Sequence, residues 1–333
     1  MPNLAIIAEL KNFDRIYYIG SKNGAERKII EKTGITYFPI TSAKFSRSFA
    51  FSNFLIPIKL FSAIIQAKHI LKNLKPNVVF SKGGYVSLPV VIAAHSLGIP
   101  VYSHESDLSL GLANKIASRY CLKVFTSFPE TALLLKNGYY SGSPIRKELL
   151  ASKRKKIVFP NGSDPDKPVL IVIGGSSGAR AVNSAVRAAK EKLVEYFNVI
   201  HICGKGNAQN IKLKGFYEIE FSDNIGELFA SSDFAVSRGG SNTVFELLAM
   251  KIPSLIIPLP KGNSRGDQVE NAEYFRKKNL IEVLEENNIT ANNFVSSVLE
   301  LKADGEILKS KLKNCNFNGA SEKIAAFLNF YAK

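Results

Sequence analysis

Residues 169–180 read VLIVIGGSSGAR, in which an apolar run leads into three glycines and then directly into a segment with helical character. Glycine lets the backbone turn sharply and come close to a ligand. The free N–H groups and the positive dipole end of the following helix, which we expect over about residues 179–197, attract an anion. This stretch therefore predicts a strand, a turn and a helix that together form a seat for a phosphate group.

Two other interpretations of the same stretch have to be weighed. Glycine turns also occur between strand and helix for packing alone. Residues 174–178 also fit the G-x-S-x-G elbow, which carries the nucleophilic serine of α/β-hydrolases. Those enzymes need an acid and then a histidine after the serine, and the only histidine after Ser176 is His201, inside a predicted strand. We therefore favour anion binding over serine hydrolysis.

The composition indicates a folded α/β protein with two domains. The chain has 333 residues, of which 46% are hydrophobic, and this is enough for two cores. Three widely spaced cysteines suggest neither a disulfide framework nor a metal knuckle and fit a reducing cytoplasm. The most apolar stretch, Phe49 to Ile65, is interrupted by Pro57 and Lys59, so it is a poor candidate for a spanning helix.

The formal net charge of +16 is unevenly distributed, because no acidic residue lies between Glu31 and Glu105. In this region phenylalanines such as Phe49, Phe54 and Phe61 alternate with basic residues, as expected where a surface rests on anionic lipid headgroups. Core packing of the aromatic residues and a solvated basic face are the competing interpretations. Nucleic acid is disfavoured because the sequence shows no recognisable base-reading motif.

Strands and helices alternate regularly along the chain, which predicts parallel sheets. The charged, proline-bearing residues 151–168 lie close to a domain boundary. We therefore expect an α/β fold of two Rossmann-like domains that face a ligand-binding cleft. The predicted strands are 15–20, 36–40, 77–81, 101–104 and 123–127 in the first half, and 169–173, 199–203, 217–221, 234–237, 254–258 and 280–283 in the second.

A second glycine turn, residues 238–246, follows the predicted strand that ends at Ser237. Glu246 lies one turn into the next helix and could accept hydrogen bonds from two neighbouring ribose hydroxyls, although a first-turn glutamate also simply favours the helix dipole. Further on, Gln268 and Asn271 carry amides, which suit a neutral sugar because they offer both donors and an acceptor. In contrast, Asp164-Pro165-Asp166 resembles a metal-binding DxD only superficially, and we interpret it as a turn.

Six ordered motifs resemble those of glycosyltransferase family 28, in particular its peptidoglycan N-acetylglucosaminyltransferases. The resemblance covers nearly the whole chain and implies a GT-B fold. Residues 1–145, completed by a helix over 319–333, would hold the lipid-linked acceptor at the membrane, and residues 146–318 would hold UDP-GlcNAc. The motifs are Ser81 to Pro89, His104 to Asp107, Gly111 to Lys115, Gly142 to Arg146, the Gly174 loop and Arg238 to Glu246.

The resemblance also assigns roles to individual residues. It places Ser176 and its loop at the donor diphosphate, Glu246 at the ribose, Gln268 at the GlcNAc hydroxyls and Arg146 as a clamp on the nucleotide. His104 and Glu105 are its catalytic candidates, and Asp107 is left without a role because many relatives have Asn there. Further donor-side residues are Gly175, Asn242, Thr243 and Asn271, and the acceptor-side residues are Gly83, Gly84 and Tyr85.

The implied reaction is an inverting transfer of GlcNAc from UDP-GlcNAc to the C4 hydroxyl of MurNAc in undecaprenyl-linked lipid I, which yields lipid II for the cell wall. A base removes the hydroxyl proton while UDP leaves. The negative charge develops on the diphosphate, where a helix amino terminus and fixed N–H donors can stabilise it, so no metal or other cofactor is expected. The implied location is the cytoplasmic face of the bacterial membrane, with the anionic lipid surface as a partner.

The beginning of the chain departs from the family pattern. Family members start with a strand and a Gly-Gly-Thr-x-Gly-His type loop, whereas Met1 to Ala5 match the segment just after that loop. We therefore expect the natural chain to extend upstream by about fifteen residues. Without this strand, two neighbouring strands lose their common partner. The loop histidine is a candidate acid/base group, so this chain is expected to bind UDP-GlcNAc yet transfer little.

Two alternatives to the lipid I transferase stay open at this stage. One is a catalytically inactive binder of nucleotide sugars, which differs in showing no turnover. The other is a different UDP-GlcNAc-using GT-B enzyme, such as a 2-epimerase or a glycolipid synthase, which differs in its acceptor.

Overall fold

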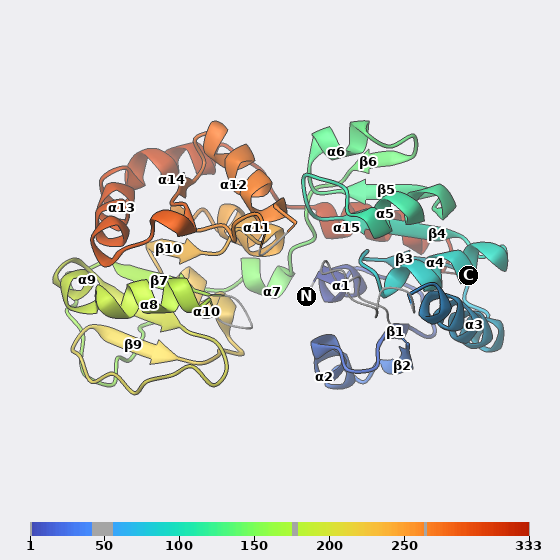
Figure 1. The fold of residues 1–333 in the computed structure, drawn as a ribbon, viewed down its shortest axis with the longest axis horizontal. Helices are drawn as coiled ribbons and strands as arrows, with labels where there is room; N and C mark the ends of the chain where they lie inside the picture. Colours follow the sequence, from blue (N-terminus) through green and yellow to red (C-terminus); the bar gives the residue numbers. More distant parts are fainter. Residues whose placement is uncertain (1, 42–55, 175–178, 263–264, 333) are drawn as a thin grey trace. The chain divides into compact units, whose positions relative to one another are not determined.

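The computed structural model describes residues 2–41, 56–174, 179–262 and 265–332. The chain divides into two compact units (Figure 1). Unit 1 consists of Met1–Pro144 and Gly319–Lys333, and unit 2 consists of Ile145–Asn318. The last segment of the chain therefore returns to the unit in which the chain begins.

Unit 2 is built on one six-stranded sheet with the order β12-β11-β10-β7-β8-β9, in which all neighbours are parallel. The order places β7 at an inner position, hydrogen-bonded to β10 on one side and β8 on the other. The carboxyl ends of all six strands therefore meet at one edge of the sheet. The strands are β7 (Val169–Ile173), β8 (Asn198–Ile202), β9 (Phe216–Ile219), β10 (Phe234–Ser237), β11 (Ser254–Ile256) and β12 (Glu282–Val283).

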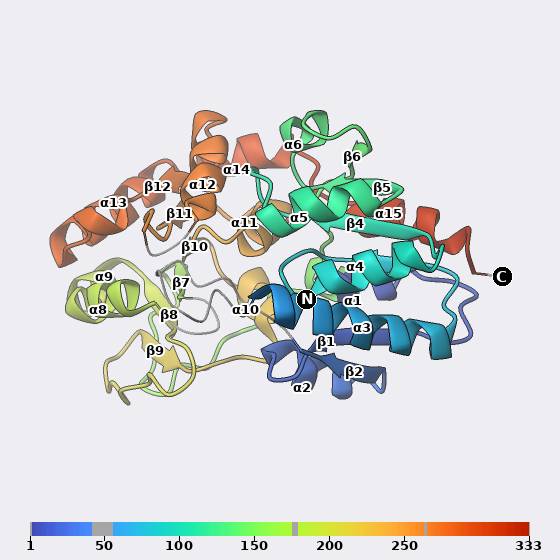
Figure 2. The ribbon, with the colours of Figure 1, turned by 45° about the vertical axis from the view of Figure 1, so that its right-hand side comes forward.

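Helices cover this sheet because most positions of its strands are apolar, and apolar residues on both faces of a sheet must be buried. One core joins Leu170 and Val172 of β7 to Val182 of α8 and Phe294 of α13. Helices α8 and α13 contact each other (Figure 2). The helices of unit 2 are α7 (Lys147–Leu150), α8 (Arg180–Ala188), α9 (Lys190–Tyr196), α10 (Ile225–Ala230), α11 (Ser241–Ala249), α12 (Asp267–Lys277), the 3₁₀ turn η3 (Glu286–Asn288), α13 (Ala291–Ala303) and α14 (Gly305–Lys313).

The sheet of unit 1 is divided into two parts. Strands β1 and β2 pair with each other, and β3, β4, β5 and β6 form a separate parallel sheet in that order. Among the described residues, β1 and β3 are not paired with each other, and residues of both strands line one cavity of about 950 Å³. The strands are β1 (Tyr17–Ser21), β2 (Thr36–Ile40), β3 (Val79–Ser81), β4 (Val101–Glu105), β5 (Lys123–Thr126) and β6 (Gly138–Tyr140).

The final helix of the chain belongs to the core of unit 1. Ile324 and Leu328 of α15 pack with Ile6 of α1 and with Tyr102 and Phe125 of the four-stranded sheet. On the other side, α3 and α4 lie against each other (Figures 1 and 2). The helices of unit 1 are α1 (Pro2–Ile7), α2 (Ala25–Glu31), α3 (Ile56–Leu74), α4 (Ser87–Ser96), α5 (Leu112–Ala117), the 3₁₀ turn η2 (Ser118–Tyr120), α6 (Pro129–Leu133) and α15 (Ala320–Asn329).

Every predicted strand has a counterpart, and the α/β class with parallel sheets is confirmed. Two local predictions were wrong. The short strand β6 was not predicted, and the helix expected over 179–197 is two helices that meet at Ala189. Within the described ranges, none of the helices combines the length and the apolar character needed to cross a bilayer.

Candidate active site

In unit 2 the end of β7 lies close to the start of α8. Gly174 N donates a hydrogen bond to Ile202 O at 3.3 Å. A Cβ atom at Gly174 would lie 2.8 Å from Ala179 N, so a side chain at this position would collide with the backbone that enters the helix. The glycine is therefore required by close approach. The predicted donor residues Gly175 and Ser176 lie outside the described residues.

The second glycine turn follows β10 and packs against α12. A Cβ at Gly239 would lie 2.8 Å from Gln268 O, so this glycine also permits a close backbone contact. The side chain of Gln268 accepts a hydrogen bond from Leu259 N at 3.0 Å. Arg238 anchors the turn by donating to Ile257 O at 3.2 Å and by an ion pair with Glu286. The ends of β10 and β11 and the start of α12 thus form one continuous rim.

Three predicted donor residues lie on the helix that follows the Gly239 turn. Asn242, Thr243 and Glu246 belong to α11, and their spacing places them on neighbouring positions of the helix surface. Asn242 is exposed, whereas Thr243 and Glu246 are half-buried. Burial raises the pKa of the Glu246 carboxyl, and the positive charge of Arg146 opposes this effect. A carboxylate in this position can accept hydrogen bonds from sugar hydroxyls.

Arg146 contributes an unsatisfied donor to unit 2. Its Nε atom is buried and has no hydrogen-bond partner within the described part of the chain. Buried polar groups in folded proteins are nearly always hydrogen-bonded, so a donor of this kind calls for an explanation. An anionic or hydroxyl-bearing ligand would supply the acceptor.

The two amides predicted at the sugar lie in different surroundings. Gln268 and Asn271 both belong to α12, which starts after Gly266, a residue with a φ of 89°. The side chain of Gln268 is half-buried, but Asn271 is 0% exposed. Gln268 is therefore the more accessible of the two, and the sugar-binding role of both residues stays a prediction.

In unit 1, the loop between β3 and α4 carries the predicted acceptor residues. Gly83 and Gly84 both have a φ of +88°, a conformation that favours glycine. A Cβ at Gly83 would overlap the side-chain amide of Asn114, whose Oδ1 accepts a hydrogen bond from Gly84 N at 3.3 Å. Tyr85 follows with 42% of its surface exposed. The loop thus presents a tyrosine on a backbone that Asn114 holds in place.

Glu105 holds the loop that follows β4. Its carboxylate accepts hydrogen bonds from Ser106 N at 2.8 Å, Asp107 N at 3.1 Å and Gly111 N at 3.1 Å. It also accepts one from Asn114 Nδ2 at 2.7 Å, and Glu105 is only 4% exposed. The four contacts engage both oxygens, so Glu105 links the loop after β4 to helix α5. Its catalytic role stays a prediction, because hydrogen bonds at an active site can rearrange when substrate binds.

His104 lies between a buried lysine and the backbone. Its Nδ1 is 2.8 Å from Lys82 Nζ and its Nε2 is 3.1 Å from Gly142 O. The Lys82 ammonium also donates to Ser106. Burial, followed by the charge of Lys82, lowers the pKa of His104 well below its usual range, and burial lowers the pKa of Lys82 to about 8. His104 is thus a neutral ring that accepts from Lys82 and donates to Gly142.

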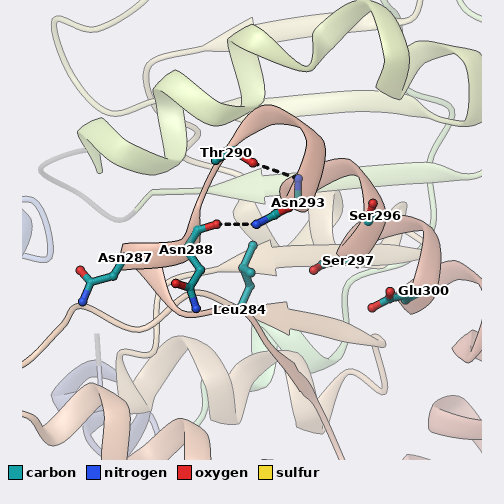
Figure 3. Close-up of a pocket in the computed structure, with 8 residues that line it drawn as sticks. All are labelled: Leu284, Asn287, Asn288, Thr290, Asn293, Ser296, Ser297 and Glu300. Atoms are coloured by element: carbon teal, nitrogen blue, oxygen red, sulfur yellow. Dashed lines mark hydrogen bonds between the residues drawn. The ribbon is translucent and has the colours of Figure 1, made fainter.

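A second hollow lies on the outer surface of unit 2, next to the start of α13 (Figure 3). Its polar groups bond with each other: Asn293 N donates to Thr290 Oγ1 at 3.2 Å, and Asn293 Nδ2 donates to Asn288 O at 3.0 Å. None of the predicted site residues lines this hollow, and nothing in it indicates a ligand.

The aspartate pair before β7 forms the expected turn. Asp166 N donates to Asp164 Oδ1 at 3.1 Å, and Asp164 N donates to Asn198 Oδ1 at 3.0 Å. These bonds give both residues a structural role. Within the described ranges, no group of three or more His, Cys, Asp or Glu side chains is arranged to hold a metal ion.

Two Rossmann-like units, with glycine turns and a helix-borne carboxylate at the strand ends of the second, define a glycosyltransferase of the GT-B class. Models of the N-terminal and C-terminal domains of glycosyltransferase family 28 match residues 1–126 and 169–326. The chain belongs to this family, and within it to the N-acetylglucosamine transferases that the following relatives represent.

Two clostridial proteins are similar to the chain over its full length. The proteins from Clostridium botulinum (strain Kyoto / Type A2) and Clostridium novyi (strain NT) are each 42% identical to it, across 100% of this chain and 96% and 95% of their own lengths. Both are named UDP-N-acetylglucosamine--N-acetylmuramyl-(pentapeptide) pyrophosphoryl-undecaprenol N-acetylglucosamine transferase.

A solved structure shares the fold. The crystal structure of Acinetobacter baumannii MurG has a TM-score of 0.74 and 20% sequence identity, and the match covers 99% of this chain and 95% of that one. The predicted family and GT-B class are therefore confirmed.

Sequence reasoning missed two sets of buried polar residues. The contact of Lys82 with His104 was not predicted, although both residues lie in quoted motifs. His201 was considered only as a missing triad member, yet it lies 3.0 Å from both Glu218 and Asn183. For the set around His201, the only signal in the sequence was a histidine at an inner position of the apolar strand β8.

Proposed function

We propose that this protein transfers GlcNAc from UDP-GlcNAc to the C4 hydroxyl of MurNAc in undecaprenyl-diphospho-MurNAc-pentapeptide, with inversion at the anomeric carbon. Full-length identity of 42% to transferases named for this reaction is the observation that carries the proposal. The arrangement of Gly174, Gly239 and Glu246 within one unit agrees with it, because turns and a carboxylate at the strand ends suit a nucleotide sugar.

The donor diphosphate is proposed to bind at the amino-terminal end of α8. The backbone N–H groups of the first turn of a helix lack intrahelical partners, and the helix dipole adds positive potential there. Arg146, whose Nε lacks an acceptor among the described residues, would add a full positive charge. When the glycosidic bond breaks, these fixed groups would stabilise the charge on the departing UDP without the need for a metal ion.

Glu246 is proposed to hold the ribose of the donor. Its partly buried carboxylate could accept hydrogen bonds from the 2′- and 3′-hydroxyls, and bonds to a charged acceptor are the stronger kind. Burial raises the pKa of this carboxyl, and the positive charge of Arg146 opposes that effect. Gln268, on the opposite side of the Gly239 turn, is proposed to reach the GlcNAc hydroxyls.

In unit 1, His104 and Glu105 are proposed to shape the acceptor site. Glu105 ties the loop after β4 to Asn114, and Asn114 in turn fixes Gly84. Through this chain, Glu105 would set the position of Tyr85, the exposed side chain of the acceptor loop. Direct proton transfer by either residue would require its present hydrogen bonds to rearrange when the acceptor binds.

The outer surface of α3 is proposed to rest on the cytoplasmic face of the membrane. Ile58, Phe61 and Ile65 are 66%, 66% and 54% exposed, and their spacing places them along one stripe of the helix. Lys59 and Lys68 supply positive charge for anionic headgroups. The other aromatic residues expected at this surface, including Phe49 and Phe54, lie outside the described residues.

The function is tested by measuring transfer of labelled GlcNAc from UDP-GlcNAc to a short-chain lipid I analogue. The assay is run with this chain and with one that is extended upstream by a strand and a Gly-Gly-Thr-x-Gly-His type loop of the family pattern. Transfer by either protein supports the proposal. Absence of transfer by both, while UDP-GlcNAc still binds, would contradict it.

Membrane contact is tested with the substitution Phe61→Ser and a matched control, Phe221→Ser. The two phenylalanines are similarly exposed, at 66% and 64%, but Phe221 belongs to unit 2. Sedimentation with vesicles that contain anionic lipid should weaken for Phe61→Ser alone. Equal binding of both variants and the unsubstituted chain would rule out α3 as the contact surface.

A further inference from the structure

A chain of buried polar side chains lies next to Gly174, the first residue of the first glycine turn of unit 2. It joins Asn183 of α8, His201 of β8 and Glu218 of β9. His201 Nδ1 is 3.0 Å from Glu218 Oε1, and His201 Nε2 is 3.0 Å from Asn183 Oδ1. His201 is 0% exposed, so water cannot take the place of either partner.

The orientation of the Asn183 amide is fixed by a third group. Its Nδ2 donates to Cys203 O at 2.8 Å, which leaves Oδ1 directed at the imidazole. The reversed amide would place its oxygen against the Cys203 carbonyl oxygen, and two acceptors repel each other. His201 Nε2 therefore faces an acceptor and needs a proton to bond with it.

The partner on the other side of the ring is also an acceptor. Burial alone would raise the pKa of the Glu218 carboxyl, but hydrogen bonds from His201, Arg187 and Gln209 outweigh burial and lower this pKa to about 2. Arg187 Nε lies 2.9 Å from Oε1, and Gln209 N lies 2.6 Å from Oε2. Glu218 is thus an anion with donors on both oxygens, and His201 Nδ1 also needs a proton.

We propose that His201 carries a proton on both ring nitrogens, and that this imidazolium is a positioning residue that places a buried positive charge behind the donor diphosphate. The part that concerns the diphosphate rests on the proposed function. The protonation of the ring rests on its contacts with Asn183 and Glu218, on the bond from Asn183 to Cys203 O, and on the donors Arg187 and Gln209 at Glu218.

Two observations connect the ring to the donor turn. A Cβ at Gly174 would lie 3.3 Å from Asn183 Oδ1, so the atom that accepts the His201 hydrogen bond lies close to the first residue of the turn. Gly174 N also bonds to Ile202 O, which is next to His201 in β8. The imidazolium therefore holds α8 against β8 at the point where the turn begins.

The charges in this cluster leave a net excess of one positive charge. Glu218 is shared by two cations, Arg187 and His201, and the side chains of Arg187 and His201 are only 17% and 0% exposed. Because the surroundings are buried, screening by solvent is weak. A diphosphate at the start of α8 would experience this charge in addition to the helix dipole.

The protonation state is tested by NMR on protein labelled with ¹⁵N-histidine. The chain has four histidines, and the substitution His201→Gln identifies the signals of this one. At neutral pH we expect both ring nitrogens of His201 to show the chemical shifts and one-bond proton couplings of protonated nitrogens. A neutral ring with one unprotonated nitrogen would overturn the proposal, whatever the activity of the protein.

The link to the diphosphate is tested by comparing the affinities for UDP and uridine. In His201→Gln we expect the affinity for UDP to fall about tenfold, the usual scale for loss of a charged hydrogen bond, while uridine changes less than about twofold. Glu218→Gln should also change the ratio of the affinities for UDP and uridine. The control is Lys192→Gln, which removes an exposed cation of α9 and should leave the ratio unchanged.

The ratio separates the outcomes because both ligands are measured on the same sample. A folding defect lowers the binding-competent fraction equally for UDP and uridine, so equal losses would overturn the positioning role. If the unsubstituted protein binds neither UDP nor UDP-GlcNAc, the proposed function fails, and the NMR result still decides the protonation of His201.

Discussion

The sheet of unit 2 is continuous, whereas the sheet of unit 1 is split. In unit 2, β7 has hydrogen-bonded partners on both sides, and the strand ends that carry Gly174 and Gly239 lie on one rim. In unit 1, β1 and β3 border a cavity of about 950 Å³. Because close packing and paired edges rigidify a domain, the donor residues have the firmer support.

The same contrast appears in how each unit holds its polar groups. Unit 2 pairs its buried charges with each other, as in the cluster of Glu218, Arg187 and His201. Unit 1 instead buries Lys82 against a neutral His104. A buried cation that has no direct ion pair among the described residues is costly, so we expect unit 1 to be the less stable of the two.

The largest effect is expected at the close approach between the Gly239 turn and α12 in unit 2. In Gly239→Ala, the new Cβ would lie 2.8 Å from Gln268 O and push α12 away from the turn. We expect loss of about 1–3 kcal/mol in the free energy of unfolding. UDP-GlcNAc affinity should fall about a hundredfold, because small displacements of positioning groups are costly.

Gly240→Ser is the matched control for this change. A Cβ at Gly240 meets nothing within 4 Å, and serine suits the N-cap position that Gly240 occupies before α11. Thermal melting and isothermal titration calorimetry should both leave this variant close to the unsubstituted protein. If the two variants behave alike, unit 2 does not depend on the close contact between the Gly239 turn and α12.

A smaller effect is expected from Glu246→Gln. If the carboxylate binds the ribose hydroxyls, this change should weaken UDP binding about tenfold, the scale of one charged hydrogen bond. The 2′-deoxy analogue of UDP should show a clearly smaller loss, because one of the two bonds is absent from the start. Equal losses for both nucleotides would place Glu246 away from the ribose.

The pH dependence of stability should differ between the units. The depressed pKa of His104 means that the unfolded chain binds a proton more readily than unit 1 does. The contribution of His104 to the free energy of unfolding is therefore complete above the ordinary histidine pKa of 6.5, and it is lost as the pH falls below that value. The contribution of Glu218 to the stability of unit 2 is lost only below pH 4.5, the ordinary pKa of a glutamate. This loss continues as the pH falls toward the folded-state pKa of about 2.

Hydrogen exchange at about pH 7.5 and about pH 5.5, corrected for the intrinsic rates, measures this difference. We expect peptides of β4 and α4 in unit 1 to lose protection on acidification, while those of β7 and β8 in unit 2 keep theirs. If the peptides of unit 2 lose protection before those of unit 1, the expectation that unit 1 is the less stable unit is wrong.

The smallest effect is expected from removal of metal ions. Because Arg146 and the amino-terminal end of α8 are proposed to stabilise the leaving diphosphate, EDTA should leave the rate of GlcNAc transfer unchanged. The control is restoration with Mg²⁺. A large loss of rate that Mg²⁺ restores would show that these groups are insufficient.

The sequence predicted most of the architecture because its signals are local. Apolar runs located the strands, and glycine turns located Gly174 and Gly239. The strand β6 was not predicted because it has only three residues, which are too few to show the alternating apolar pattern of a strand. The break at Ala189 has no glycine or proline to mark it, so the expected helix was drawn too long.

Parts of the candidate site could not be predicted because they depend on contacts between distant residues. Glu105 was selected from a motif, but its four hydrogen bonds could not be read from the sequence. The bond between His201 and Glu218 joins residues 17 positions apart, and pairing of β8 with β9 brings them together. Such networks become visible only when the strand register is known.

The central claim is that the donor elements belong to unit 2 and the acceptor elements to unit 1. Hydrogen exchange with and without saturating UDP-GlcNAc tests it most directly. The account predicts increased protection in peptides that contain Gly239 to Glu246 and the start of α8. Protection confined to the loop of unit 1 that contains Gly83, Gly84 and Tyr85 would contradict it.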